Sequence, residues 1–215
     1  SPDEKWVILA EENLDSIKVF GTDQRRMDYS FQLDGFNHAA IQSLAIVAGG
    51  RTCLIALKSG QILRYDQQLQ KITVWKSSVP SIQHLQWSTS GKWLLVLGKK
   101  LELWSSESIF NPTSGPFRVF QLNALGLKAT LDAAEHRLLL CDANGDASVF
   151  DIATQHKQFT LRSRGPKIIA AEFGAGDQSI ITLNNQGAIW SWALPAIAPL
   201  HQGPSRAIGL LNARG

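Results

Sequence analysis

The sequence predicts an all-β fold in which one short unit is repeated along the chain, and three observations support this. Short apolar runs rich in Val, Ile, Leu, Trp and Phe alternate with stretches of Gly, Asn, Ser and Pro. No stretch keeps the 3.6-residue period of an amphipathic helix over three turns. The apolar runs recur with a period of about forty residues, a length typical of repeat folds. We therefore expect strands throughout, arranged as structural copies of one another.

The best template for the repeat is SIQHLQWSTSGKWLLVLGKKLELWSS, residues 81–106. Copies align with it at residues 167–193, 125–152 and 40–67, and residues 1–22 match from its middle onward. Each copy reads as a strand, a short turn, a second strand, a tight turn, a third strand and a weaker fourth strand. The segments KSGQ, ANGD and NNQG supply the Gly and Asn that the tight turn requires. An aromatic residue closes every third strand: Phe20, Tyr65, Trp104, Phe150 and Trp192.

A period near forty residues with four strands per unit predicts the blades of a β-propeller, because one such sheet cannot bury both of its faces alone. We expect a single propeller domain over residues 1–215, with four-stranded antiparallel blades. The expected blades are residues 1–35 plus 206–213, 39–76, 81–121, 125–163 and 167–203.

The two ends of the chain predict how the ring closes. The first residues begin where the first strand of a blade would just have ended, and RAIGLLN, residues 206–212, reads as a spare first strand. Placed beside Trp6–Leu9, that strand would complete one blade and close a ring of five. The alternative is a five-blade part of a larger ring, since seven blades need on the order of 300 residues.

Four segments resemble the WD-repeat β-propellers. SPDEKW and STSGKW are similar to that family's turn between first and second strands, and LRYD and SVFDI to its closing pair of an aromatic residue and Asp. The acid is kept only at Asp66 and Asp151, and the nearest pair to the family's Gly-His is Asn37–His38. The resemblance implies a propeller that binds other proteins, and a buried Asp–His–Ser–Trp network that this sequence does not reproduce.

Composition and charge argue against several classes of function. The formal net charge is +3 and no Lys or Arg block occurs, so the charge alone does not favour nucleic-acid binding. That hypothesis stays open, and it would need a continuous basic stripe and a salt-dependent affinity. The apolar runs are far shorter than the roughly 20 residues of a membrane helix, and no signal peptide is visible. We therefore expect a protein of the cytoplasm or another intracellular compartment, without membrane contact.

No sequence motif points to catalysis, a metal or a cofactor. Phosphate-binding, zinc-protease, paired C-x-x-C and G-x-S-x-G motifs are absent from the sequence, and the five histidines are scattered. Cys53 and Cys141 lie inside apolar strands and are expected to be buried free thiols. We therefore expect no catalytic residues.

The first strands of the repeats are expected to line the central channel. Their alternation places His84, Lys128 and Glu172 where they would face that channel. In one interpretation these side chains pair with one another or with ordered water. In the other they form a site that binds a small ligand or a glycan, and that site could also hydrolyse the glycan.

The expected partner-binding surface combines aromatic and basic residues on one face. Trp190 occupies a position that is mostly polar in the other copies, and such a Trp is either an interface anchor or an inter-blade contact. Loops joining successive blades are expected to bring basic residues to the same face. Such a face suits an acidic protein surface or, less well, a phosphate backbone, unless it is only solvated. The predicted partner-binding residues are Phe36, His38, Trp75, Arg162, Arg164, Lys167, Trp190 and Arg206.

One copy carries an insertion. Residues 105–120, SSESIFNPTSGPFRVF, lengthen the link between third and fourth strands and read as a loop in which Ile109 and Phe110 are exposed. Insertions of this kind often carry function.

Overall fold

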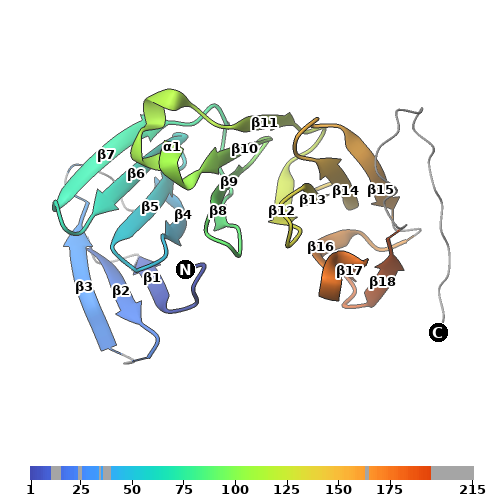
Figure 1. The fold of residues 1–215 in the computed structure, drawn as a ribbon, viewed down its shortest axis with the longest axis horizontal. Coiled ribbons are helices and arrows are strands. Elements are labelled where there is room, and N and C mark those ends of the chain that lie inside the picture. Colours follow the sequence, from blue (N-terminus) through green and yellow to red (C-terminus); the bar gives the residue numbers. More distant parts are fainter. Residues whose placement is uncertain (11–15, 24–25, 34, 36–39, 163–164, 195–215) are drawn as a thin grey trace. The chain divides into compact units, whose positions relative to one another are not determined.

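A computed structural model describes residues 1–10, 16–23, 26–33, 35, 40–162 and 165–194, and these form two compact units, Ser1–Asn123 and Ala124–Gly215. Each unit consists of antiparallel β-sheets (Figure 1). The prediction of an all-β chain is therefore confirmed. The predicted site residues Phe36, His38, Arg164 and Arg206, and the segment 206–212, lie outside the described residues.

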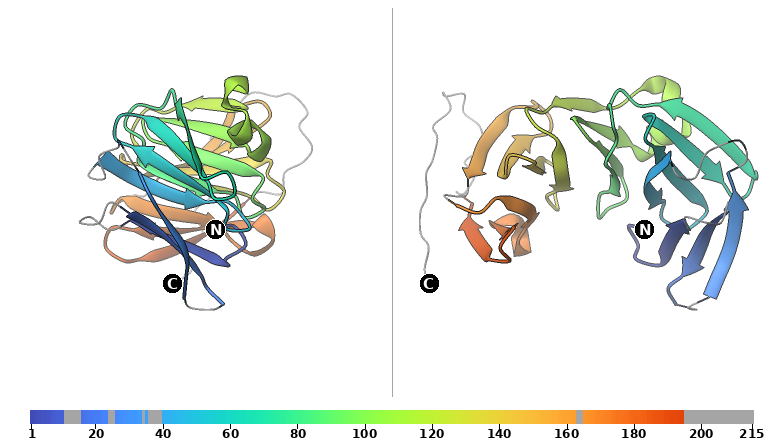
Figure 2. Two further views of the ribbon diagram at one scale, coloured as in Figure 1. Left: turned by 90° about the vertical axis from the view of Figure 1, so that its left-hand side faces the viewer. Right: turned by 180° about the vertical axis from the view of Figure 1, so that it is seen from behind.

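The first unit contains three sheets that follow one another along the chain (Figures 1 and 2). The first sheet, in the order β1-β2-β3, consists of β1 (Trp6–Ala10), β2 (Ser16–Gly21) and β3 (Arg26–Gln32). The second is β4 (Ile41–Ile46), β5 (Thr52–Leu57), β6 (Gln61–Asp66) and β7 (Lys71–Lys76). The third is β8 (His84–Trp87), β9 (Trp93–Leu97), β10 (Lys100–Ser105) and β11 (Arg118–Gln121), with helix α1 (Ser106–Phe110) and a 3-10 turn (Pro112–Ser114) between β10 and β11.

The second unit contains two further sheets. The fourth sheet is β12 (Gly126–Leu131), β13 (Arg137–Asp142), β14 (Asp146–Asp151) and β15 (Lys157–Arg162). The fifth is β16 (Ile168–Phe173), β17 (Ser179–Asn184) and β18 (Ile189–Ala193), with a 3-10 turn (Ala175–Asp177) between β16 and β17. All five closing aromatic residues lie in the expected strands, β2, β6, β10, β14 and β18.

The same six-residue turn precedes the second strand of every repeat. In each turn the amide of the first residue donates to the carbonyl of the sixth, and the amide of the fourth donates to the carbonyl of the first. In the opening copy the amino group of Ser1 takes the role of the first amide. The turns are residues 1–6, 47–52, 88–93, 132–137 and 174–179. The predicted equivalence of SPDEKW and STSGKW is thus confirmed in backbone geometry.

The fourth residue of each turn has a positive φ. These residues are Glu4, Gly50, Gly91, Glu135 and Asp177, with φ between 55° and 73°. A residue in the left-handed region reverses the chain within the turn, and Gly does so at the least steric cost. The recurrence of one strained position in all five copies shows that the repeat extends to the backbone conformation of single residues.

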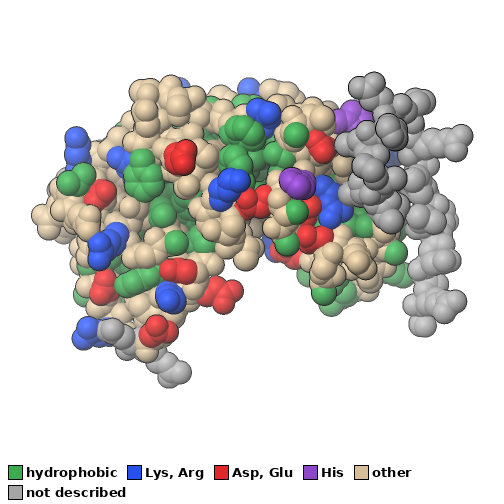
Figure 3. All heavy atoms as spheres, in the orientation of Figure 1, with side chains coloured by type: hydrophobic (Ala, Val, Ile, Leu, Met, Phe, Trp, Pro, Cys, Tyr) green, Lys and Arg blue, Asp and Glu red, His purple; other side chains and the backbone are tan. Residues whose placement is uncertain are grey.

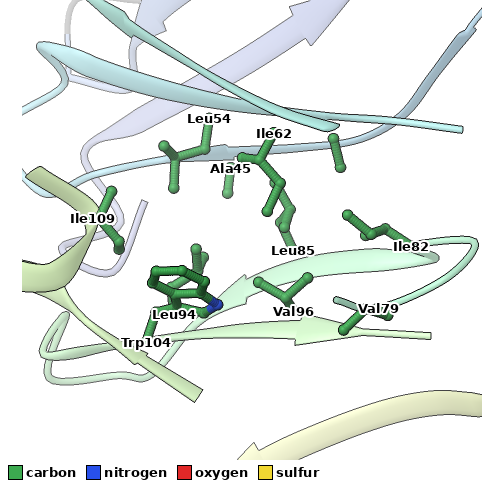
Figure 4. Close-up of a cluster of buried hydrophobic side chains, with 11 residues drawn as sticks. Ala45, Leu54, Ile62, Val79, Ile82, Leu85, Leu94, Val96, Trp104 and Ile109 are labelled. Carbon is green, nitrogen blue, oxygen red and sulfur yellow. The ribbon is translucent and has the colours of Figure 1, made fainter. Parts of the chain in front are cut away.

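Neighbouring sheets within each unit pack face to face. Figure 4 shows Leu54 and Ile62 of the second sheet pointing toward Leu94 and Trp104 of the third. On its other face the second sheet packs against the first, where Phe31 and Tyr65 stack with ring centroids 3.7 Å apart. In the second unit the fourth and fifth sheets enclose a similar apolar cluster. Stacking of this kind buries faces that a single small sheet would leave in water.

The first and fifth sheets each have one apolar face that remains exposed. Val7, Leu9 and Met27 of the first sheet are more than two-fifths exposed, and so are Ile169, Ile181 and Ile189 of the fifth. The opposite faces of these two sheets pack against the second and the fourth sheet. Each of the two sheets therefore has one covered face and one face that solvent reaches.

The turn at Gly50 joins the first two sheets. The indole of Trp6 lies directly over Gly50, so that a Cβ atom there would come within 2.3 Å of the ring. The Tyr29 hydroxyl donates to the Gly50 carbonyl (2.5 Å), and the Gly49 amide donates to the Asp3 carboxylate (3.1 Å). Both the positive φ of 73° and the close approach of Trp6 thus require glycine at position 50.

We predict that Gly50→Ala lowers the free energy of unfolding by about 2–4 kcal/mol, from the left-handed backbone and the clash with Trp6 together. Gly49→Ala is the matched control, because Gly49 has a φ of +84° but a Cβ atom added there would meet no heavy atom within 4 Å. This control is expected to lose only about 1 kcal/mol. Urea denaturation measures both, and equal losses would contradict the role of Trp6.

Candidate interaction surface

Lys167 connects two hairpin turns of the second unit. Its Nζ donates to the Ala143 carbonyl (3.2 Å), and its own carbonyl accepts from the Asn185 amide (2.9 Å). Its stem passes so close to Gly145 that a Cβ atom there would come within 2.7 Å of it. The β13–β14 and β17–β18 turns therefore meet at Lys167, which is exposed.

Arg162 lies at the same end of this unit. It is the last residue of β15, and its Nε lies 3.5 Å from the Asp146 carboxylate, at the first residue of β14. The Arg162 side chain is largely exposed, so this ion pair contributes little to stability. Its guanidinium therefore remains accessible to an acidic group from outside.

Trp190 is the second residue of β18, just after the β17–β18 turn, and it is 48% exposed. Its cross-strand partner Thr182 is buried and accepts a hydrogen bond from Trp192 (2.9 Å), so this part of the sheet is ordered around an exposed indole. The equivalent residues Leu63, Glu102 and Ser148 are buried. Trp190 therefore differs from these three equivalents in its exposure to solvent, besides the difference in residue type that the sequence shows.

Three of the predicted partner-binding residues, Arg162, Lys167 and Trp190, thus belong to one end of the second unit. Their backbone positions are fixed by the pairing of β14 with β15 and of β17 with β18, and by the hydrogen bonds of Lys167 and Ile168 to the two hairpin turns. We call these three residues the Trp190 surface. An exposed indole at the same end of a unit as two cations allows an aromatic anchor and charge attraction to act on one partner.

Trp75 has a structural role in the first unit. It lies within β7, half-buried against the apolar cluster between the second and third sheets, and its ring centroid is 6.1 Å from that of Trp104. The sequence placed it in or next to a connecting loop. In the structure its indole belongs to the packing between sheets, which leaves less of it for a partner.

The residues predicted to face a channel are distributed over both units. Lys128 on β12 and Glu172 on β16 form an ion pair, with 2.6 Å between Nζ and Oε1. His84, on β8 of the first unit, is exposed. Within the described residues, no group of His, Cys, Asp and Glu is placed to hold a metal ion.

A groove that the sequence did not reveal lies along the edge of β1 that faces away from β2. It has a volume of about 470 Å³ and is lined by β1, by β4 and β8, and by the turns that begin at Ser1 and Ser88. By its turn, β1 corresponds to the second strand of the other sheets, yet among the described residues it pairs only with β2. β4 and β8 are the first strands of the second and third sheets. The groove beside β1 therefore lies where a first strand of the first sheet would lie.

The insertion is ordered by a short helix. Ser105 caps α1 by accepting from the Ser108 amide (3.1 Å), and Ile109 is fully buried in the core. The expectation that Ile109 is exposed is therefore wrong, because this residue anchors the helix. Phe110 is 49% exposed, as expected, and Phe117 at the other end of the insertion is 44% exposed.

Glu102 forms a buried polar network that the sequence also did not reveal. Its carboxylate accepts hydrogen bonds from the Ser77 hydroxyl, the Ser78 amide and the Trp104 indole, each at 2.8 Å. These three donors explain how a carboxylate can be buried between two sheets. The network ties the chain after β7 to the closing aromatic residue of the next sheet.

On the face shown in Figure 3, Lys and Arg side chains of the described residues are interspersed with Asp and Glu and form no continuous band. In the part of the chain that the structure describes, no helix has the length and apolar character needed to cross a membrane. No protein-family model matches the sequence, and no curated protein was found to match it.

We predict that Glu102→Ala lowers the free energy of unfolding by about 3 kcal/mol, because three donors lose their acceptor and two of them, the Ser77 hydroxyl and the Trp104 indole, are buried. Ser148→Ala, at the equivalent position of the fourth sheet, is the control and removes only a hydroxyl bonded to Thr160. That change is expected to cost about 1 kcal/mol. Chemical denaturation distinguishes the two, and a Glu102→Ala protein as stable as the wild type would contradict the role of the network.

Cys53 and Cys141 are buried and free, as expected, and burial raises the pKa of Cys53 to about 11 and that of Cys141 to about 12. At pH 8 both are thiols, and the thiol form reacts poorly with iodoacetamide. We predict that mass spectrometry finds both cysteines unlabelled in the native protein and both labelled in guanidinium chloride. Rapid native labelling of either would contradict its burial.

Proposed function

We propose that the five sheets are the blades of a propeller that resembles the WD-repeat family, closed into a ring by residues 206–212 beside β1. Three observations support this proposal. The same turn and closing aromatic residue recur in every sheet, the first and fifth sheets each expose one apolar face, and a groove runs along the edge of β1 that faces away from β2. Closure would cover these faces and complete the first blade.

Two hydrogen-bonded tryptophans also favour the family resemblance. Trp104 donates to Glu102, which also binds the Ser77 hydroxyl, and Trp192 donates to the Thr182 hydroxyl. Each links a closing Trp to a buried polar group, as the family's network does. In this chain a carboxylate and a threonine take over parts that the family assigns to other residues.

The propeller would act as a protein-interaction scaffold or as the recognition module of a larger complex. The observation that carries this proposal is the half-exposed Trp190, at a position that is buried in three other sheets, on the same end as Arg162 and Lys167. Exposed tryptophans in preorganised settings are typical anchors of protein interfaces. The two cations favour a partner whose surface is acidic.

The Trp190 surface is held rigidly, which favours binding. The β17–β18 turn is held by the Lys167 carbonyl, and the β13–β14 turn by the Lys167 side chain and the Ile168 amide. A surface fixed in this way loses little conformational entropy when a partner binds. Arg162 and Lys167 would mainly raise the rate of association, whereas Trp190 would slow dissociation.

The experiment is a quantitative affinity capture from an extract of the source organism, with wild type, Trp190→Ala and Leu69→Ala as baits. Leu69 is the control because it is an exposed apolar residue of the other unit. We predict that a stoichiometric protein is retained by wild type and Leu69→Ala and falls at least about tenfold with Trp190→Ala, as expected for an anchor worth about 2 kcal/mol or more. Equal capture by all three baits would contradict the proposed surface, provided that Trp190→Ala melts like the wild type.

A further inference from the structure

The insertion between β10 and β11 creates a second aromatic and basic surface, on the first unit. The corresponding links of the neighbouring sheets, residues 67–70 and 152–156, are simple turns, whereas residues 106–117 form α1 and a 3-10 turn. We call Phe110 and Phe117, together with Arg64, Lys92 and Arg118 around them, the insert surface. It shares no residue with the Trp190 surface.

The exposure of Phe110 is imposed by the fold. Ile109 is buried in the core and its carbonyl accepts a hydrogen bond from Arg64 Nη1 (2.9 Å), so α1 cannot rotate without breaking both contacts. The next residue of a helix points about 100° away, so Phe110 must face outward. The Arg64 guanidinium carbon lies 5.1 Å from the centre of the Phe110 ring, which holds a cation beside the exposed ring.

Phe117 is held in a similar way at the other end of the insertion. Its ring lies on the buried Trp93, with centroids 4.9 Å apart, and the Arg118 guanidinium carbon is 4.2 Å from its centre. Lys92 Nζ is 5.1 Å from the Trp93 ring, and the Lys92 carbonyl accepts the Ser106 amide at the start of α1. Each exposed phenylalanine is thus a fixed apolar group with a cation against it or close by.

We propose that the insert surface binds an acidic peptide segment that also carries large apolar side chains. The charges favour this partner, because Arg64 lies against Phe110, Arg118 against Phe117 and Lys92 against the neighbouring Trp93. Glu107 is the one acidic residue among residues 105–120. The Nη1 groups of Arg64 and Arg118 already donate to backbone carbonyls and their Nε atoms are buried, so these cations act on a carboxylate through their charge. The exposed edges of the two phenylalanine rings accept Leu or Phe. A nucleic-acid strand fits less well, since Phe117 already contacts Trp93 and Arg118 and offers little free face to a base.

This inference goes beyond the proposed function, because it assigns a second surface and the chemistry of its partner. The test uses fluorescein-labelled short peptides in which Asp and Glu alternate with Leu and Phe. The comparison probes are the same peptides with Lys in place of the acids, and a short oligo(dT). Fluorescence anisotropy measures their binding to wild type and to three variants, Phe110→Ala/Phe117→Ala, Leu69→Ala and Trp190→Ala.

We predict saturable binding of the acidic peptides, weakened at least about tenfold by Phe110→Ala/Phe117→Ala and unchanged by Leu69→Ala and Trp190→Ala. Added salt should weaken it, because the attraction is between charges near the surface. Equal binding of the Lys peptides, tighter binding of oligo(dT), no acidic-peptide binding, or full binding by the double variant would each overturn the proposal. Thermal melting checks that the double variant is folded, and since Trp190→Ala leaves this surface intact, the two proposed surfaces succeed or fail separately.

Discussion

Face-to-face stacking of small sheets is the constraint on which the rest of the structure depends. A sheet of three or four short strands has two faces, and in this chain both faces are apolar wherever a neighbouring sheet covers them. The second sheet shows this most clearly, because Leu54 and Ile62 face the third sheet while Cys53 and Leu63 face the first. The first and fifth sheets depart from this pattern, because each leaves a row of apolar residues exposed. Ile189 of the fifth sheet, for example, is 71% exposed. Exposing such an apolar row to water costs free energy, and a further layer of protein over the row would remove that cost.

The recurring six-residue turn fixes how the stacked sheets meet. Its positive-φ residue brings the backbone close to the neighbouring sheet, as at Gly50, where the Trp6 ring lies against the glycine. At the opposite ends of the sheets the tight turns are contacted by the chain that enters the next sheet. For example, the Lys167 side chain packs against Gly145, and the Ser77 amide donates a hydrogen bond to the Gly60 carbonyl. The Trp190 surface is built on these fixed turns, and the insert surface is held by Ile109, which is buried between sheets and accepts a hydrogen bond from Arg64. Each surface is therefore positioned by contacts between sheets.

The repeat and its strands could be predicted from the sequence because they rest on local properties. Alternating apolar runs, glycine-rich turns and one closing aromatic residue recur at a spacing that a single chain reveals. The environment of single side chains could not be predicted in the same way, because it depends on contacts between sheets. Ile109 was expected to be exposed and is an anchor of the core, since a five-residue helix capped by Ser105 turns it inward. Nothing in the sequence marks Glu102 as buried, because its donors, Ser77 after β7 and Trp104 of β10, are brought to it only by the packing of two sheets.

We have proposed that residues 206–212 pair with β1 and thereby close the sheets into a ring. Hydrogen–deuterium exchange of β1, in the full chain and in a chain that ends at residue 202, tests this pairing. We expect the amides of Trp6–Ala10 to exchange slowly in the full chain and markedly faster in the shortened one, while β5 and β9 exchange alike in both. Equal exchange of β1 in the two chains would contradict closure by this segment.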